Sequence, residues 1–89
     1  MRAVITVIGK DKVGIIARIS NILADSGVNI LDISQTIMQE LFTMVMLVDM
    51  SGAKCTNADI IGQLDKMGAD MDLSIRFQDE EIFNSMHRI

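Results

Sequence analysis

The order of hydrophobic and polar residues in the first half of the chain predicts a strand, a helix and a second strand. Residues 2–8 have apolar side chains at both alternating sets of positions, which is typical of a strand buried on both faces. Residues 28–38 alternate more weakly and predict an edge strand with one solvated face. Between these strands, residues 12–26 predict a helix with four apolar residues on its inward face, Ile15, Ile19, Ile22 and Leu23.

The third predicted strand is residues 41–50, which again are apolar at both sets of positions. It is therefore expected in the centre of a sheet, where neighbouring strands and packed layers cover both faces. The turn that joins it to the strand before it is expected near Gln39 and Glu40, although no glycine marks the place.

The remaining elements are a helix, a strand and a short helical tail. Thr56 and Asp59 resemble a capping box, so the second helix is expected to begin there and to end at Gly68. Residues 72–78 alternate cleanly and predict the fourth strand. Residues 79–89 have apolar side chains at helical spacing and predict a short amphipathic helix.

The order β-α-β-β-α-β predicts an α+β sandwich, with one four-stranded antiparallel sheet and both main helices on the same face. Two right-handed split β-α-β units give this arrangement, and they place the first and third strands in the centre. The face without the two helices is still apolar at its centre, so something is expected to cover it. The candidates are a second copy of the chain, paired through the sheet or its edges, and the C-terminal helix.

The composition excludes several classes of partner. The chain has 89 residues with a net charge of −4, which argues against nucleic acid or an anionic membrane as the main partner. No apolar run approaches the roughly 20 residues of a membrane span, and no secretory signal is evident. The single cysteine, Cys55, excludes an internal disulfide, and a cytoplasmic location is expected.

The segment between the first strand and the first helix has the most distinctive chemistry. Gly9 is expected to end the strand sharply, and Asp11 is placed to cap the helix with its carboxylate. Gly14 is expected in the first helical turn, where it costs about 1 kcal/mol relative to alanine. Amides at a helix N-terminus attract anions, and a missing side chain would give a ligand access to them.

This segment resembles the ACT domain family of small ferredoxin-like modules that bind amino acids and regulate metabolic enzymes. The resemblance rests on Gly-Lys-Asp-Lys-Val-Gly-Ile-Ile at residues 9–16 and Ser-Gly-Val-Asn-Ile at residues 26–30, and it covers residues 2–78. The chain is therefore divided into an ACT domain, residues 1–78, and a helical tail, residues 79–89. The ending resembles a group of free-standing ACT proteins of uncharacterised role, which are also similar to the repressor of the glycine cleavage system.

The resemblance implies an amino-acid site near the first turn, often at an interface between two domains. Carried over residue by residue, it implicates Asp11, Val13, Gly14, Ile15, Asn29 and Ile30. Amides near Gly14 would take the ligand carboxylate, Asp11 would pair with the ammonium, and Asn29 would face them across a narrow crevice. Each has an alternative role without a ligand: Asp11 as the helix cap, Gly14 as a tight packing point, and Asn29 as a turn-stabilising side chain.

Other candidate chemistry is weak. His87 is the only histidine and is interpreted as a solvated tail residue, because a metal site needs several convergent ligands. No catalytic set, phosphate-binding loop, metal site or cofactor fingerprint stands out. The leading hypothesis is a non-enzymatic regulatory module that senses an amino acid and acts on another protein. The alternative is a structural protein–protein interaction module with no ligand.

Overall fold

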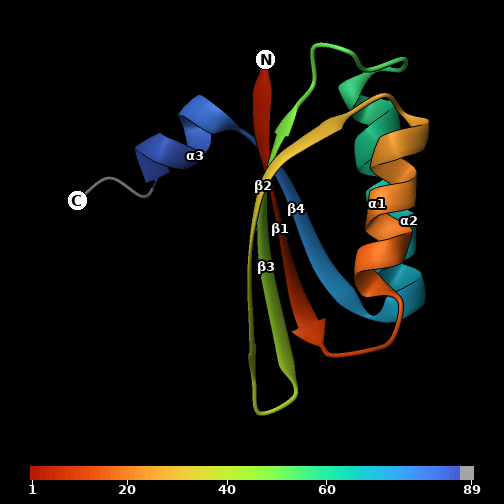
Figure 1. Ribbon diagram of the computed structural model, residues 1–89, viewed down its shortest axis with the longest axis vertical. Coiled ribbons are helices and arrows are strands. Elements are labelled where there is room, and N and C mark those ends of the chain that lie inside the picture. The colour runs from red at the N-terminus through yellow and green to blue at the C-terminus, as the bar shows by residue number, and fades with distance from the viewer. Residues whose placement is uncertain (87–89) are drawn as a thin grey trace.

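The computed structural model describes residues 1–86, and it has the predicted order of elements followed by a third helix (Figure 1). His87 and the two residues after it lie outside the described residues, so the prediction made for His87 is not examined by the structure. The elements are β1 (Arg2–Lys10), α1 (Ile15–Asp25), β2 (Asn29–Met38), β3 (Leu41–Asp49), α2 (Asn57–Met71), β4 (Leu73–Asp79) and α3 (Glu80–Met86).

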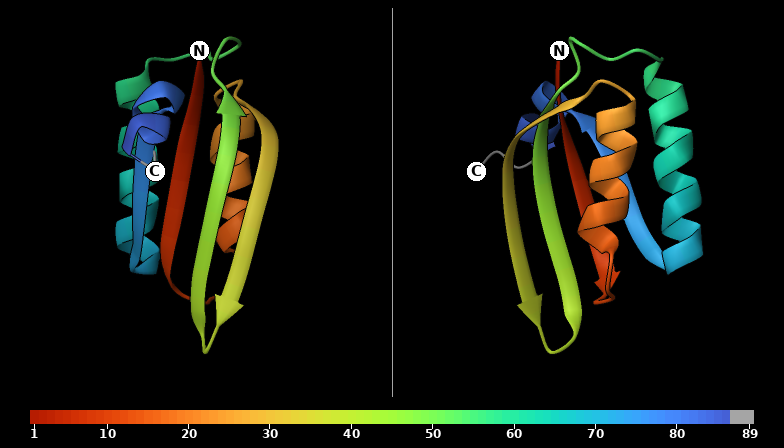
Figure 2. Two further views of the ribbon diagram at one scale, coloured as in Figure 1. Left: turned by 90° about the vertical axis from the view of Figure 1, so that its left-hand side faces the viewer. Right: turned by 45° about the vertical axis from the view of Figure 1, so that its right-hand side comes forward.

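The four strands form one antiparallel sheet in the order β2-β3-β1-β4. This confirms the predicted α+β sandwich, with β1 and β3 central and β2 and β4 at the edges. Helices α1 and α2 lie side by side on one face, and α3 lies on the other (Figures 1 and 2). Among residues 1–86, no helix has the length and apolar character needed to cross a membrane.

The core between the sheet and the two helices is built from aliphatic and methionine side chains. Phe42 is the one aromatic residue of the described chain that is buried in it, and Met44 and Met46 lie beside it on β3. Both methionines of β3 therefore pack in the core. The other fully buried large side chains are Ile5, Val7, Ile15, Ile19, Leu23, Val48, Ile60 and Leu64.

The start of α1 differs from the prediction. The helix begins at Ile15, and Gly14 is its N-cap residue with φ of 92°, a left-handed conformation that favours glycine. Among residues 1–86, no side chain caps this helix, so the predictions of Asp11 as the cap and Gly14 within the first turn are both wrong. The backbone amide of Asp11 instead donates to the carbonyl of Glu40, at 2.7 Å.

Two other glycines have packing roles that the sequence did not indicate. Strand β1 continues to Lys10 rather than ending at Gly9, where a Cβ would meet the Leu73 side chain at 2.5 Å. Helix α2 continues past Gly68 to Met71, and a Cβ on Gly68 would lie 2.9 Å from the carbonyl oxygen of Leu73. Both glycines therefore allow the close approach of β4 and the segment leading into it.

The ends of α2 are held by side chains. The predicted capping box is confirmed, because Thr56 Oγ1 accepts from the Asp59 amide and Asp59 Oδ2 accepts from the Thr56 amide, both at 3.2 Å. At the other end, the Lys12 ammonium donates to the carbonyl of Met71. This contact places a positive charge at the negative end of the helix dipole and joins the first turn to α2.

Strand β2 is more exposed than predicted. The turn at Gln39 and Glu40 is confirmed, with both residues at positive φ. Every residue from Leu31 to Glu40 is exposed, so the prediction of one solvated face is wrong and both faces are solvated. The physical reason is that α1, which begins only at Ile15, leaves the far half of β2 uncovered.

Helix α3 covers one end of the sheet face that α1 and α2 leave open. The Arg2 guanidinium makes hydrogen bonds of 2.7–3.0 Å to both carboxylate oxygens of Glu80 and holds the start of the helix against β1. Val4, which points to this face, is only 5% exposed. The C-terminal helix is therefore part of the predicted cover, while Ile8 and Leu41 farther along the face stay exposed.

Candidate functional site

The residues implicated around the first turn have different environments. Asp11 and Val13 are exposed, and the Val13 side chain is as open to solvent as in an extended chain, at 101%. Ile15 is 2% exposed and belongs to the core, so its backbone alone is available to a ligand. Apart from Gly14 itself and its two chain neighbours, no atom of the described residues lies within 4 Å of a Cβ built on Gly14, which excludes the alternative that this glycine is a tight packing point.

The N-terminus of α1 is open on the side of Gly14. The Gly14 carbonyl accepts the first helical hydrogen bond from the Arg18 amide, at 3.0 Å. The amides that follow Gly14 therefore have no partner within the helix, and none of the described side chains caps it. Because such amides bind anions, this turn can accept a carboxylate, and the Asp11 carboxylate is not used as a cap.

The conformation of Gly14 gives a stability prediction with a matched control. Gly14→Ala should lower the free energy of unfolding by about 1–2 kcal/mol, because alanine disfavours a left-handed backbone even where space is open. Gly62 lies inside α2, and among the described residues a Cβ there would meet no atom within 4 Å other than the helix's own backbone. Gly62→Ala should instead raise the free energy of unfolding by about 0.5–1 kcal/mol. Urea denaturation followed by circular dichroism measures both, and equal effects would contradict the assigned role of Gly14.

Asn29 and Ile30 lie at the opposite end of α1 from Gly14. Helix α1 has 11 residues, and it therefore separates Gly14 from the start of β2 by about 16 Å. Asn29 is exposed and pairs in register with Asp49, whereas Lys10, just before the first turn, pairs with Leu41 at the other end of the sheet. Within one chain the structure does not bring Gly14 and Asn29 together, and the expected crevice between them is absent from the described residues.

Asp49 lies beside Asn29 at this end of the sheet and is paired with Arg2 on its other side. The backbone amide of Ser51 donates to Asp49 Oδ1 at 2.9 Å, and the Ser51 hydroxyl donates to the same oxygen at 2.7 Å. These two bonds hold the pKa of the Asp49 carboxyl below its usual value, and the bond from the Ser51 amide has the larger effect. The positive charges of the amino terminus and Arg2 lower this pKa further, so Asp49 is already compensated by cations of the chain itself.

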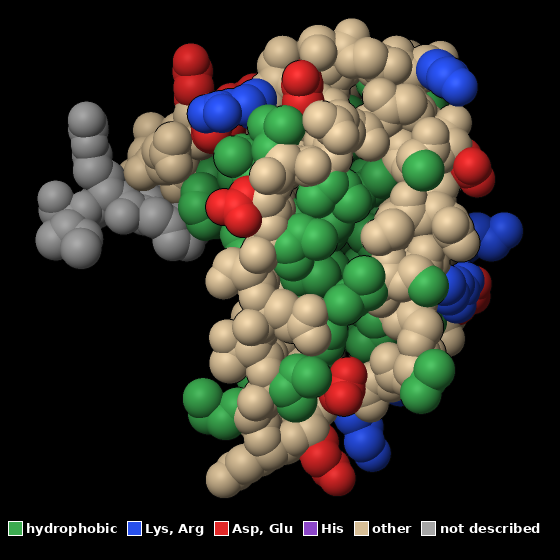
Figure 3. All heavy atoms as spheres, viewed as in Figure 1, with side chains coloured by type: hydrophobic (Ala, Val, Ile, Leu, Met, Phe, Trp, Pro, Cys, Tyr) green, Lys and Arg blue, Asp and Glu red, His purple; other side chains and the backbone are tan. Residues whose placement is uncertain are grey.

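The exposed side of β2 forms an apolar patch that the sequence did not indicate. Ile33 and Ile37 pair with Met46 and Phe42, so they point to the helix-covered face, yet they are 41% and 53% exposed. Ile16, on the flank of α1 away from α2, is also exposed. Figure 3 shows hydrophobic side chains gathered between β2 and α1. We call Ile16, Ile33 and Ile37 the β2–α1 patch. The alternation of apolar residues along residues 28–38 was the sequence pattern that could have indicated this patch, but we interpreted it as a buried face.

Neither a metal centre nor a catalytic constellation is evident in the part of the chain that the structure describes. Within residues 1–86, no three histidine, cysteine or acidic side chains are gathered in a way that could hold a metal ion. The features that remain are an open helix N-terminus, a free Asp11 carboxylate, an exposed Asn29 and an uncovered strand edge. These groups can bind and position a small polar molecule or a second chain.

Comparison with known proteins gives consistent results. A family model described as an ACT domain matches residues 2–78. A UPF0237 protein of Clostridium acetobutylicum is 58% identical over 89 residues, the full length of both chains. The solved structure of an ACT domain protein from Streptococcus pneumoniae matches with a TM-score of 0.78 and 41% identity over 93% of each chain. A candidate glycine cleavage system transcriptional repressor matches with a TM-score of 0.72 and 26% identity over 86% of this chain and 44% of that one.

Proposed function

The chain belongs to the ACT domain family, and on that premise we propose that it is a non-enzymatic regulatory module that binds a small amino acid between two copies of itself. We place the ACT domain at residues 1–78, with α3 in a tail at residues 79–89, and the protein in the cytoplasm. Its target would be another protein. The observation that supports the proposal most directly is that the edge of β2 is uncovered in a chain whose turn at Gly14 is also open.

The edge of β2 is the proposed dimer interface. An edge strand that is long and apolar offers unpaired backbone groups to another strand, and proteins rarely leave such an edge uncovered. Strand β2 has ten residues, and the exposed apolar side chains Leu31, Ile33 and Ile37 lie along it. A second copy that pairs with this edge would satisfy the backbone groups and cover the β2–α1 patch.

The same pairing would complete the ligand site. Two β2 strands that pair about a two-fold axis perpendicular to the sheet run antiparallel. The start of one strand then lies beside the end of the other, so Asn29 of one copy approaches the first turn of its partner. This arrangement accounts for an opposition of Gly14 and Asn29 that a single chain cannot provide.

The groups brought together would suit a zwitterion. The amides that follow Gly14 would bind the carboxylate, since they are open and uncapped. The exposed Asp11 carboxylate of the same turn would bind the ammonium, and the Asn29 amide from the other copy would add a donor and an acceptor. Ligand binding would then stabilise the paired state and bias any surface that differs between the two states.

A thermal-shift screen of the twenty amino acids tests the proposal. A ligand that binds only the folded dimer should raise the melting temperature progressively, and at about 100 times its dissociation constant it adds about 2.7 kcal/mol of stability. A matched titration with the corresponding amino-acid amides, which lack the carboxylate, should give no comparable rise. If no amino acid raises the melting temperature, the ligand proposal fails and the alternative, a protein–protein interaction module, is favoured by the same exposed β2 edge.

A further inference from the structure

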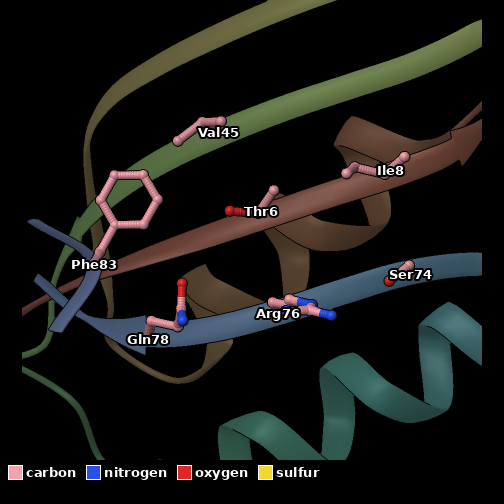
Figure 4. A pocket seen from close by; sticks show the side chains of 7 residues that line it. All are labelled: Thr6, Ile8, Val45, Ser74, Arg76, Gln78 and Phe83. Carbon is pink, nitrogen blue, oxygen red and sulfur yellow. The ribbon is translucent and has the colours of Figure 1, made fainter. Parts of the chain in front are cut away.

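The sheet face opposite α1 and α2 contains a hollow that the proposed function does not use. Its volume is about 600 Å³, within the range of small-molecule sites, and α3 forms one wall of it. The Phe83 side chain stands over the sheet at one end, and Val45 and Ile8 form an apolar floor (Figure 4). Such a surface can take the flat apolar part of a small molecule.

Polar side chains lie directly beside this floor. Thr6 pairs with Val45 on one side and with Arg76 on the other, so the three form one row across β3, β1 and β4. Ile8 and Ser74 form the next row, which places a second hydroxyl near Arg76. Side chains in directly paired positions are about 5 Å apart, so a single small molecule can contact both rows.

The charge of the hollow selects the ligand. The Arg76 guanidinium lines it, and among the described residues Arg76 has no ion pair. Glu80, at the start of α3, is bound by Arg2, and none of the described residues that line the hollow carries a carboxylate. The chain as a whole has a net charge of −4, whereas the hollow contains a positive charge. The hollow therefore favours an anion, which the guanidinium can bind through charge-assisted hydrogen bonds.

We propose that this hollow binds a small organic acid that has one carboxylate and a flat apolar body. The carboxylate would pair with Arg76 and accept from the hydroxyls of Thr6 and Ser74, while the apolar body would lie on Val45 beneath Phe83. An amino acid fits less well, because the lining offers no carboxylate to its ammonium group. The site is therefore separate in position and in ligand chemistry from the one proposed at the first turn.

Titration of the ¹⁵N-labelled protein with phenylacetate, followed by NMR, tests the proposal. The amide signals of Thr6, Val45 and Arg76 should shift and saturate below about 10 mM. Phenylacetamide, which has the same ring without the charge, and L-phenylalanine, which adds the ammonium, should each bind at least about tenfold more weakly. Arg76→Gln should weaken phenylacetate binding to the same extent, whereas Arg18→Gln, an equal charge change on α1, should leave it unchanged.

Several outcomes would overturn the proposal. Equal binding of phenylacetate and phenylacetamide, equal effects of Arg76→Gln and Arg18→Gln, or shifts confined to the first turn would each exclude the assigned site. Absence of saturable shifts would exclude it as well, and so would shifts of the same signals on dilution alone, which would show that a second copy covers this face. The signals at the first turn report on the amino-acid site independently, so the failure of one proposal does not imply the failure of the other.

Discussion

Replacing Leu31 and Ile37 together by lysine is expected to convert the proposed dimer into a monomer. Both side chains are exposed on β2, at 44% and 53%, so the substitutions should leave the fold of each chain intact. Burying one such apolar side chain at an interface contributes about 1.5–3 kcal/mol, and the two-fold symmetry counts each change twice. The dissociation constant of the dimer should therefore rise by at least about 100-fold.

Sedimentation velocity from about 1 to 100 μM measures this change, a range that brackets a micromolar dissociation constant. The matched control is Ile82→Lys on α3, because Ile82 is similarly exposed, at 57%, but lies away from the β2 edge. Circular dichroism should show that all variants remain folded. A wild-type protein that stays monomeric throughout, or a double variant that dimerises as the wild type does, would refute the β2 interface.

The second large effect is expected at Asn29. Once an amino-acid ligand has been found in the screen, Asn29→Ala should weaken its binding by about 10- to 100-fold, because the amide is proposed to make two hydrogen bonds to it. The melting temperature without ligand should hardly change, since Asn29 is exposed. Isothermal titration calorimetry measures the loss of affinity directly.

Asn21→Ala provides the control for this experiment. Asn21 is an exposed asparagine on α1, and the proposal gives it no contact with the ligand. Its affinity for the amino acid should equal that of the wild type. If Asn29→Ala also binds with wild-type affinity, then Asn29 is a strand-start residue without a ligand role, and the shared site is wrong in its present form.

The fold could be predicted from the sequence because local patterns and topology agreed. Strands β1 and β3 are apolar at both sets of positions, and this pattern predicts the central place that they occupy in the sheet. The capping box at Thr56 marked the start of α2 for a purely local reason. Such features depend on neighbours within a few residues, and a sequence shows these directly.

The errors arose where distant residues decide the local structure. Gly68 looks like the end of a helix, but it lies within α2, and the close approach of the Leu73 carbonyl explains the glycine there by excluding a side chain. Asp11 looks like a helix cap, but a left-handed Gly14 delays the helix and the Asp11 amide bonds to Glu40 across the turn. The alternation in β2 predicted a covered face, and the short α1 leaves it open.

The candidate site shows the same division. The motif indicated the first turn and Asn29, and both are accessible in the structure. The sequence alone did not show that α1 separates them by its whole length, since that distance depends on where the helix begins and on the direction of β2. The resemblance already placed such sites at interfaces between two domains, and the separation of Gly14 and Asn29 within one chain supports the proposed site between two copies.

A mixing experiment tests this shared site most directly. Asp11→Ala and Asn29→Ala change exposed residues at the two proposed halves of the site, and each variant alone should lose high-affinity binding of the amino acid. When equal amounts are unfolded and refolded together, half of the dimers should be mixed, and one of the two sites in each should contain both intact residues. The account predicts recovery of about a quarter of the wild-type sites, at wild-type affinity. If the mixture recovers no high-affinity binding, the site does not lie between two copies.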